Sequence, residues 1–179
     1  MAGAASAERR TLALELRAKG RRLEGYAATF GTETRIGRFT ETIRAGAFRA
    51  SLAEGGDVLA LVDHDPTRVL ARTRSGTLRL AEDSRGLAFD LDLPDTSAGR
   101  DVLALAERRD LGGMSFGFVA TDEAWAADRR ELRAVKLLEI SIVSAWPAYD
   151  GTVIDARMRA GTTALAERRR RYLDHLRAC

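Results

Sequence analysis

Two segments far apart in the sequence carry the residue types that nucleophilic catalysis needs. His64 lies in Asp-His-Asp-Pro, directly after an apolar run, and Ser115 lies in Gly-Gly-Met-Ser-Phe-Gly-Phe. A serine hydroxyl is a poor nucleophile until a neighbouring base takes its proton, so a serine between glycines and one imidazole are the minimum for acyl transfer. The chain has two histidines, and only His64 is far from the C-terminal end. Together these residues indicate the chemistry of a serine peptidase.

Each segment also has a structural interpretation. Asp-His-Asp-Pro alone favours a turn in which an aspartate caps backbone amides and the histidine is incidental. The glycines around Ser115 would allow tight packing of a strand start, with Phe116 and Phe118 on the other face. In the functional interpretation they leave space for a peptide and free amides for an oxyanion. A strand pattern rather than a helix follows Ser115, which disfavours an α/β-hydrolase.

Glu139 is the third residue that could take part in this chemistry. It begins Glu-Ile-Ser-Ile-Val, and a carboxylate that enters an apolar strand needs a partner because burial of an unpaired charge is costly. An imidazole would satisfy the carboxylate, which would hold the tautomer of the ring and stabilise the imidazolium. An ion pair with an arginine is an equally good interpretation. Ser141, two residues later on the same face, could bond to the same network.

The elements that must position these residues are mostly short strands. Apolar patterning predicts a strand pair near the start of the chain, a buried strand that ends at His64, a three-stranded antiparallel meander, and later strands that carry Ser115 and Glu139. Six or more strands with one or two helices predict a mainly β fold with helices (α+β), a closed or nearly closed antiparallel β-barrel flanked by helices. The predicted strands cover 12–27, 57–63, 69–93, 114–120, 130–144 and 153–154, and the predicted helices cover 45–53 and 98–109. Ser97 is the expected cap of the second helix and Gly112 its stop.

Length and composition indicate one domain of ordinary size. A chain of 179 residues with 45% hydrophobic and 31% charged residues is typical of a soluble globular protein, and no apolar run is long enough to cross a bilayer. The first residues lack the pattern of a secretory signal, so we expect the protein to stay where it is made. We predict a disordered N-terminus over 1–10, a peptidase domain over 11–157 and a basic helical tail over 158–179.

Other classes of chemistry lack the residues that they need. One interior histidine and one terminal cysteine, Cys179, cannot make a zinc site, and the glycine patterns lack the lysine of a phosphate-binding loop. We therefore expect no metal and no cofactor. The arginine run 168–171 lacks the interleaved aromatic residues that bind single strands, and the rest of the chain is nearly neutral. A nucleic-acid-associated protein acting through 157–177 is thus the weakest alternative.

Several segments together resemble the prohead proteases of tailed bacteriophages and related gene transfer agents. These are procapsid maturation peptidases whose fold is similar to that of the herpesvirus assemblin. The resemblance extends from about Leu23 to Arg157, and it is specific because many short segments occur in the same order and spacing. The matching segments are 25–27, 41–48, 63–66, 82–87, 99–101, 113–118, 139–143 and 147–149.

The resemblance implies a barrel with flanking helices and a set of roles. Ser115 would be the nucleophile, His64 the general base, and Glu139 the third member, a position that the herpesvirus relatives fill with a histidine. The alternative is an enzyme that works largely as a dyad of Ser115 and His64. The substrates would be the internal scaffold, the N-terminal extension of the major capsid protein and the protease itself. The protein would act inside the procapsid in the cytoplasm of a bacterial host, with no membrane and no required nucleic acid. The oligomeric state stays undetermined, and a homodimer or a larger homo-oligomer is compatible with the resemblance.

A non-enzymatic interpretation stands beside this one. The chain could be a scaffold or assembly module of the procapsid in which Ser115 and His64 are merely structural. A reagent that labels activated serines would separate the two interpretations, because labelling requires a reactive hydroxyl.

Overall fold

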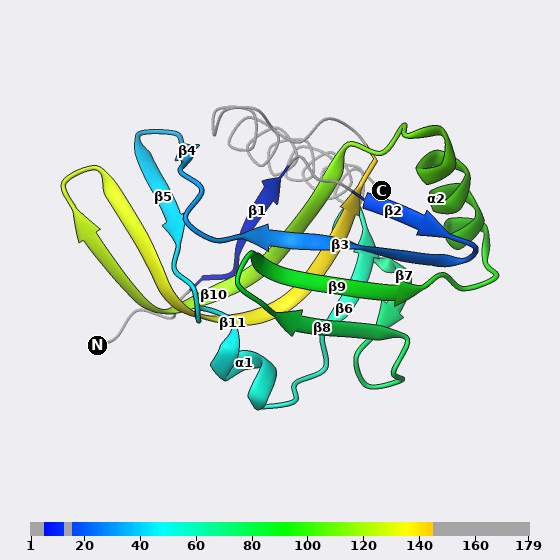
Figure 1. Ribbon diagram of the computed structural model, residues 1–179, viewed down its shortest axis with the longest axis horizontal. Coiled ribbons are helices and arrows are strands. Elements are labelled where there is room, and N and C mark those ends of the chain that lie inside the picture. Colours follow the sequence, from blue (N-terminus) through cyan, green and yellow to red (C-terminus); the bar gives the residue numbers. More distant parts are fainter. Residues whose placement is uncertain (1–5, 13–15, 145–179) are drawn as a thin grey trace, which may run out of the picture.

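The computed structural model describes residues 6–12 and 16–144, which form two open β-sheets and two helices (Figure 1). The larger sheet has seven strands and is built on one long hairpin, β10 (Gly113–Ala126) and β11 (Arg129–Val143). On the β10 side of this hairpin lies β1 (Glu8–Leu12), which is antiparallel to β10. On the other side, β5 (Phe39–Ile43) and β6 (Leu59–Val62) both pair parallel with β11, at opposite ends of it. The sheet is completed by β4 (Thr34–Ile36) beside β5 and β7 (Asp65–Arg72) beside β6.

The smaller sheet has four antiparallel strands. Its order is β2 (Leu16–Lys19), β3 (Arg22–Thr29), β9 (Gly86–Asp92) and β8 (Leu78–Glu82). In Figure 1 this sheet crosses the β10–β11 hairpin, while the turn of the hairpin projects away from it beside β4 and β5. The two helices are α1 (Arg49–Ala53) and α2 (Ser97–Arg108).

The hydrophobic core lies between the two sheets. Side chains alternate between the faces of a strand, so the even-numbered positions at the start of β10 point to one face. These positions are Met114, Phe116 and Phe118, and all three are fully buried, as are Leu23 of β3 and Leu87 of β9. The opposite face of the same stretch of β10 is therefore the one that carries Ser115.

The predicted α+β class is confirmed, but the prediction of a closed or nearly closed barrel is wrong. Both sheets are open, and they do not continue into one another. The predicted meander over 69–93 is also wrong as a unit, because β7 pairs with β6 in the larger sheet while β8 and β9 extend β3 in the smaller one. Apolar alternation marks where strands lie, but it does not say which strand each one pairs with.

The individual elements agree better with the sequence. Helix α2 covers the predicted segment, although its N-cap is Thr96, whose hydroxyl accepts a hydrogen bond from the Gly99 amide, and it ends at Arg109 in a left-handed conformation. The segment that we expected to be disordered up to residue 10 contains an ordered strand from Glu8 on. The predicted strand at 153–154 and the predicted tail over 158–179 lie outside the described residues. Within the described part of the chain, neither helix is long and apolar enough to span a membrane.

Candidate active site

The β10–β11 hairpin brings two of the predicted site residues onto one face of the larger sheet. Ser115 is opposite Ser141, and Gly117 is opposite Glu139. Because side chains alternate along each strand, these four positions share a face, and Ser115 and Glu139 are diagonal neighbours on it. The alternation that buries Phe116 in the core thus presents Ser115 on the other side.

His64 reaches this face from a tight turn. β6 runs parallel to β11 with Val62 opposite Ile142, and Asp63 and His64 form the two-residue connection to β7. Both have positive φ, 51° for Asp63 and 61° for His64, as hairpin turns of this length require. Aspartate and histidine are among the residues other than glycine that adopt this conformation most often, so the residue types of the turn fit its geometry.

Asp63 holds this turn against the end of the β11 segment. Its carboxylate accepts hydrogen bonds from the backbone amide of Ser144 at 2.8 Å and from the Ser144 hydroxyl at 2.9 Å. Its own amide donates to the carbonyl of Ile142 at 2.9 Å. Asp63 and His64 therefore form a turn, as the structural interpretation predicts, while Asp65 and Pro66 already belong to β7, and the turn also directs the histidine toward β11.

His64 and Glu139 are in direct contact. His64 Nδ1 lies 2.6 Å from Glu139 Oε1, and both side chains are largely buried. An ionised carboxylate only accepts hydrogen bonds, so the imidazole donates to it from Nδ1, and in the neutral form of such a ring the lone pair is on Nε2. The other carboxylate oxygen, Oε2, accepts a 2.6 Å hydrogen bond from the Ser141 hydroxyl, which confirms that Ser141 joins this network.

Both interpretations of the Glu139 carboxylate are realised in the structure. Besides the imidazole, Arg9 of β1 approaches it, with Nε 3.7 Å from Oε1. The arginine side chain is 58% exposed. A pair as long and as exposed as this contributes little, so the imidazole is the stronger partner.

Gly117 makes room for the Glu139 carboxylate. A Cβ atom at position 117 would lie 2.6 Å from Glu139 Oε1, closer than non-bonded atoms approach. Glycine at this position therefore allows the carboxylate to lie over β10, where it meets His64. The glycines around Ser115 were noticed in the sequence, but this particular contact could not be seen there because it depends on the register of two strands.

Ser115 is completely buried, and its hydroxyl bonds to β1. Ser115 Oγ donates a 2.7 Å hydrogen bond to the carbonyl oxygen of Arg10. Among the described residues, no hydrogen bond joins Ser115 to His64. The structure thus places the three predicted residues on one face, with His64 and Glu139 in contact and the serine engaged by a strand that sequence reasoning missed. Glu-Arg-Arg-Thr, at the start of that strand, has no apolar alternation that would have revealed it.

A second polar cluster lies between β1, β5, β10 and β11. Glu41 of β5 is 2% exposed and accepts hydrogen bonds from two arginines, Arg10 Nε at 2.5 Å and Arg130 Nη1 at 3.0 Å. Arg130 also binds Glu8 at 2.5 and 2.7 Å and Glu123 at 2.7 Å. We call these five residues the ionic cluster. Burial opposes the charge of Glu8, but hydrogen bonds from Arg130 and Arg10 outweigh it and lower the pKa of its carboxyl.

Metal binding has no candidate in the part of the chain that the structure describes. Within residues 6–12 and 16–144, no group of three or more histidine, cysteine, aspartate or glutamate side chains is arranged to hold a metal ion. The polar side chains on the face that carries Ser115 are instead an imidazole, a carboxylate and hydroxyls, which are groups that transfer protons.

The fold is similar to that of a known viral protease. The solved structure of the capsid assembly protease of bacteriophage T4, gp21, matches with a TM-score of 0.58 and 10% sequence identity, over 76% of this chain and 96% of that one. At this identity the match shows a shared fold and no more. No curated protein matches the chain.

The family is shown by sequence. The family model of the caudovirus prohead serine protease matches residues 8–166, which is most of the chain. The chain therefore belongs to the caudovirus prohead serine proteases, and it is a serine protease of capsid maturation. This sets aside the alternative of a non-enzymatic scaffold module.

Proposed function

We propose that Ser115 is the nucleophile of this protease, that His64 is its general base, and that Glu139 orients and stabilises the imidazole. The observation that carries the proposal is the 2.6 Å hydrogen bond between His64 Nδ1 and Glu139 Oε1 on the face of the sheet that carries Ser115. A base bound on one side by a carboxylate keeps its other nitrogen free for the hydroxyl. Diagonal neighbours on paired strands are about 7–8 Å apart, a span that an imidazole fills.

The chemistry follows from these roles. His64 Nε2 takes the proton from Ser115 Oγ as the oxygen attacks the carbonyl carbon of the scissile peptide bond. The positive imidazolium forms beside the Glu139 carboxylate, which stabilises it. The imidazolium then gives its proton to the leaving amine, and water releases the acyl group by the same route in reverse.

The proposed substrates are capsid-assembly proteins. The family to which the chain belongs is named for the prohead, and the T4 protease that shares its fold is named for capsid assembly. Both names support cleavage of internal scaffold and of the N-terminal extension of a major capsid protein. Cleavage of the protease itself is part of the same proposal. We also propose that the protein acts inside the procapsid in a bacterial host, and that its fold is similar to that of the herpesvirus protease.

Co-expression with the cognate capsid protein tests this function. Mass spectrometry of the capsid N-terminus should show a shortened chain with the wild-type protease and the full-length chain with Ser115→Ala or His64→Ala. Two matched controls, Ser84→Ala at an exposed turn and His175→Ala at the other histidine, should cleave like the wild type. Cleavage that survives Ser115→Ala would overturn the proposal.

A further inference from the structure

The strand β1 engages the candidate active site at two points. The carbonyl oxygen of Arg10 accepts the hydrogen bond of the Ser115 hydroxyl at 2.7 Å, and the guanidinium of Arg9 lies 3.7 Å from the Glu139 carboxylate. A hydroxyl that donates its proton to a peptide carbonyl is not available to a base. With Ser115 completely buried, a substrate cannot reach its oxygen in this arrangement. The described structure is therefore closed at the nucleophile.

The position of β1 is also one that an extended peptide would take. β1 is the outermost strand of the larger sheet and is antiparallel to β10, with Thr11 opposite Ser115. Without β1, the backbone N–H and C=O groups along this edge of β10 would be unpaired, and such an edge binds extended segments as an added strand. A peptide bound there would pass directly beside Ser115.

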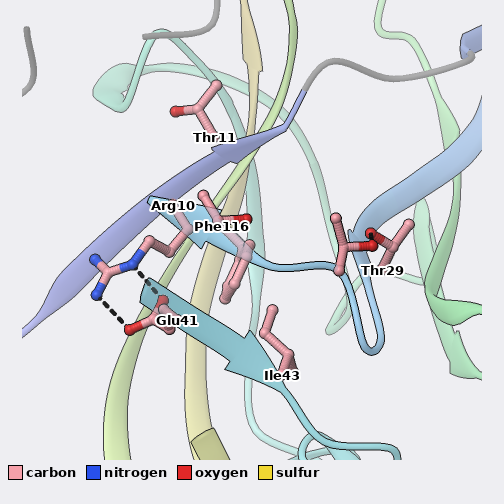
Figure 2. Close-up of a pocket in the computed structure, with 8 residues that line it drawn as sticks. Arg10, Thr11, Thr29, Glu41, Ile43 and Phe116 are labelled. Carbon is pink, nitrogen blue, oxygen red and sulfur yellow. Dashed lines mark hydrogen bonds and ion pairs between the residues drawn. The ribbon is translucent and has the colours of Figure 1, made fainter. Parts of the chain in front are cut away.

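Residues 8–11 of β1 are held chiefly by charged side chains, including the Arg10 guanidinium, which lies 5.4 Å from the centroid of the Phe118 ring. Residues 8–11 are Glu-Arg-Arg-Thr, so they contribute no apolar side chain to the core. Besides the pairing with β10, the ionic cluster holds the strand, chiefly through the pair of Arg10 with Glu41 that Figure 2 shows. A small pocket of about 10 Å³ lies beside this pair, lined by Thr11, Ile43 and Phe116 among others. Apolar burial is the main stabilising term in folding, and a segment such as 8–11, which supplies no apolar side chain, is comparatively easy to displace.

We propose that β1 occupies the substrate-binding edge of the protease, and that an extended substrate peptide binds to β10 only after β1 has left it. The inference rests on the proposed role of Ser115. It assigns two states to the chain: a closed state, in which Arg10 and Arg9 engage Ser115 and Glu139, and an open state, in which the substrate strand replaces β1. The partner is a peptide in extended conformation, recognised in large part through its backbone.

The test measures how fast a fluorophosphonate labels Ser115 in the full-length chain. Arg10→Ala removes the pair that ties β1 to Glu41 but leaves the backbone carbonyl of residue 10 in place. It should raise the rate of labelling roughly tenfold, the factor that corresponds to about 1.4 kcal/mol. The matched control is Arg129→Ala, which removes an arginine from an exposed pair with Glu33, outside the ionic cluster. Its rate should equal that of the wild type.

A second variant and a second measurement guard against misfolding. Glu41→Gln weakens the same tie from the other side, and it should also accelerate labelling. In both variants, the backbone amides of residues 8–12 should exchange with deuterium faster than in the wild type. The amides that pair β10 with β11 should stay protected.

The outcomes separate the two claims. If wild-type Ser115 is labelled in a His64-dependent manner but neither Arg10→Ala nor Glu41→Gln is faster, the role of β1 is overturned and the proposed function stands. If Ser115 is labelled in none of these variants, the proposed function falls and the inference falls with it. Faster labelling of both variants, together with faster exchange at residues 8–12, supports the inference.

Discussion

Two buried carboxylates, Glu139 and Glu41, lie in the same sheet in opposite chemical surroundings. Glu139 is held by an imidazole and a hydroxyl, at 2.6 Å each. Glu41 is held by two guanidinium groups, Arg10 and Arg130. Arginine is permanently charged, so its pairs keep one arrangement, whereas an imidazole changes its charge near neutral pH. The Glu139 surroundings can therefore move a proton, while those of Glu41 hold strands together.

The largest expected effect is that of Glu139→Gln. An amide cannot fix the tautomer of His64 or stabilise its charged form, so the rate of cleavage should fall by about 1,000-fold or more. Glu131→Gln is the matched control, because it removes the same charge from an exposed pair with Arg133 on the same strand. Initial rates on a capsid-extension peptide measure both variants. A cleavage rate of the Glu139→Gln enzyme within tenfold of the wild-type rate would contradict the proposed difference in role between Glu139 and Glu41.

Loss of Arg130 from the ionic cluster should lower the stability of the fold. Arg130→Ala leaves Glu41 and Glu8 with one arginine fewer in a largely buried position, and loss of one partner of a buried pair costs about 3–5 kcal/mol. Arg129→Ala, next to it on an exposed pair, should change the free energy of unfolding by less than about 0.5 kcal/mol. Urea denaturation measures both. Equal destabilisation by the two variants would show that the cluster does not stabilise the fold.

Gly117→Ala should damage the Glu139 site without removing any of its functional groups. The added Cβ would lie 2.6 Å from Glu139 Oε1, so the carboxylate must shift away from His64. A misplacement of about 1 Å lowers rates about 100-fold. Gly56→Ala is the control, because a Cβ there meets no atom within 4 Å. A Gly117→Ala enzyme as active as the Gly56→Ala enzyme would mean that the carboxylate position is unimportant.

The smallest expected effect is the dependence of stability on pH at Glu8. Its pKa is lowered in the folded protein from an ordinary value of 4.5, so its contribution is fully present above pH 4.5 and is lost as the pH falls through the folded value. Glu8→Gln should therefore flatten the loss of stability on acidification below pH 4.5. Thermal midpoints of the two proteins across this range measure the difference. If the thermal midpoints of the wild type and of Glu8→Gln fall in parallel as the pH is lowered, the lowered pKa of Glu8 does not contribute to stability.

The sequence predicted the Glu139 site better than the ionic cluster. His64, Ser115 and Glu139 each carry a local signal, namely a histidine in a turn after a buried strand, a serine between glycines, and a carboxylate in an apolar run. The contacts of Glu41 and Arg130 depend on strands that are distant in the sequence, and arginine and glutamate are common at any surface. No spacing in the chain distinguishes them from solvated residues.

The architecture could be predicted only to the level of its elements. The long β10–β11 hairpin has register shifts between Gly117 and Phe118 and on both sides of Asp122, and β5 and β6 pair with different ends of β11. Parallel pairing of β5 and β6 with β11 leaves no trace in the alternation of either strand. The predicted barrel is wrong for this reason: closure is a property of strand order, which the pattern of apolar residues does not contain.

The central claim is that Ser115 becomes reactive through His64, and labelling by a fluorophosphonate tests it most directly. Peptide mass spectrometry of the labelled wild-type chain should find the adduct on Ser115, and the rate of labelling should fall by about 1,000-fold in His64→Ala. The control His175→Ala should label like the wild type. An adduct that forms on Ser115 at the same rate without His64, or none on Ser115 even in Arg10→Ala, would contradict the account.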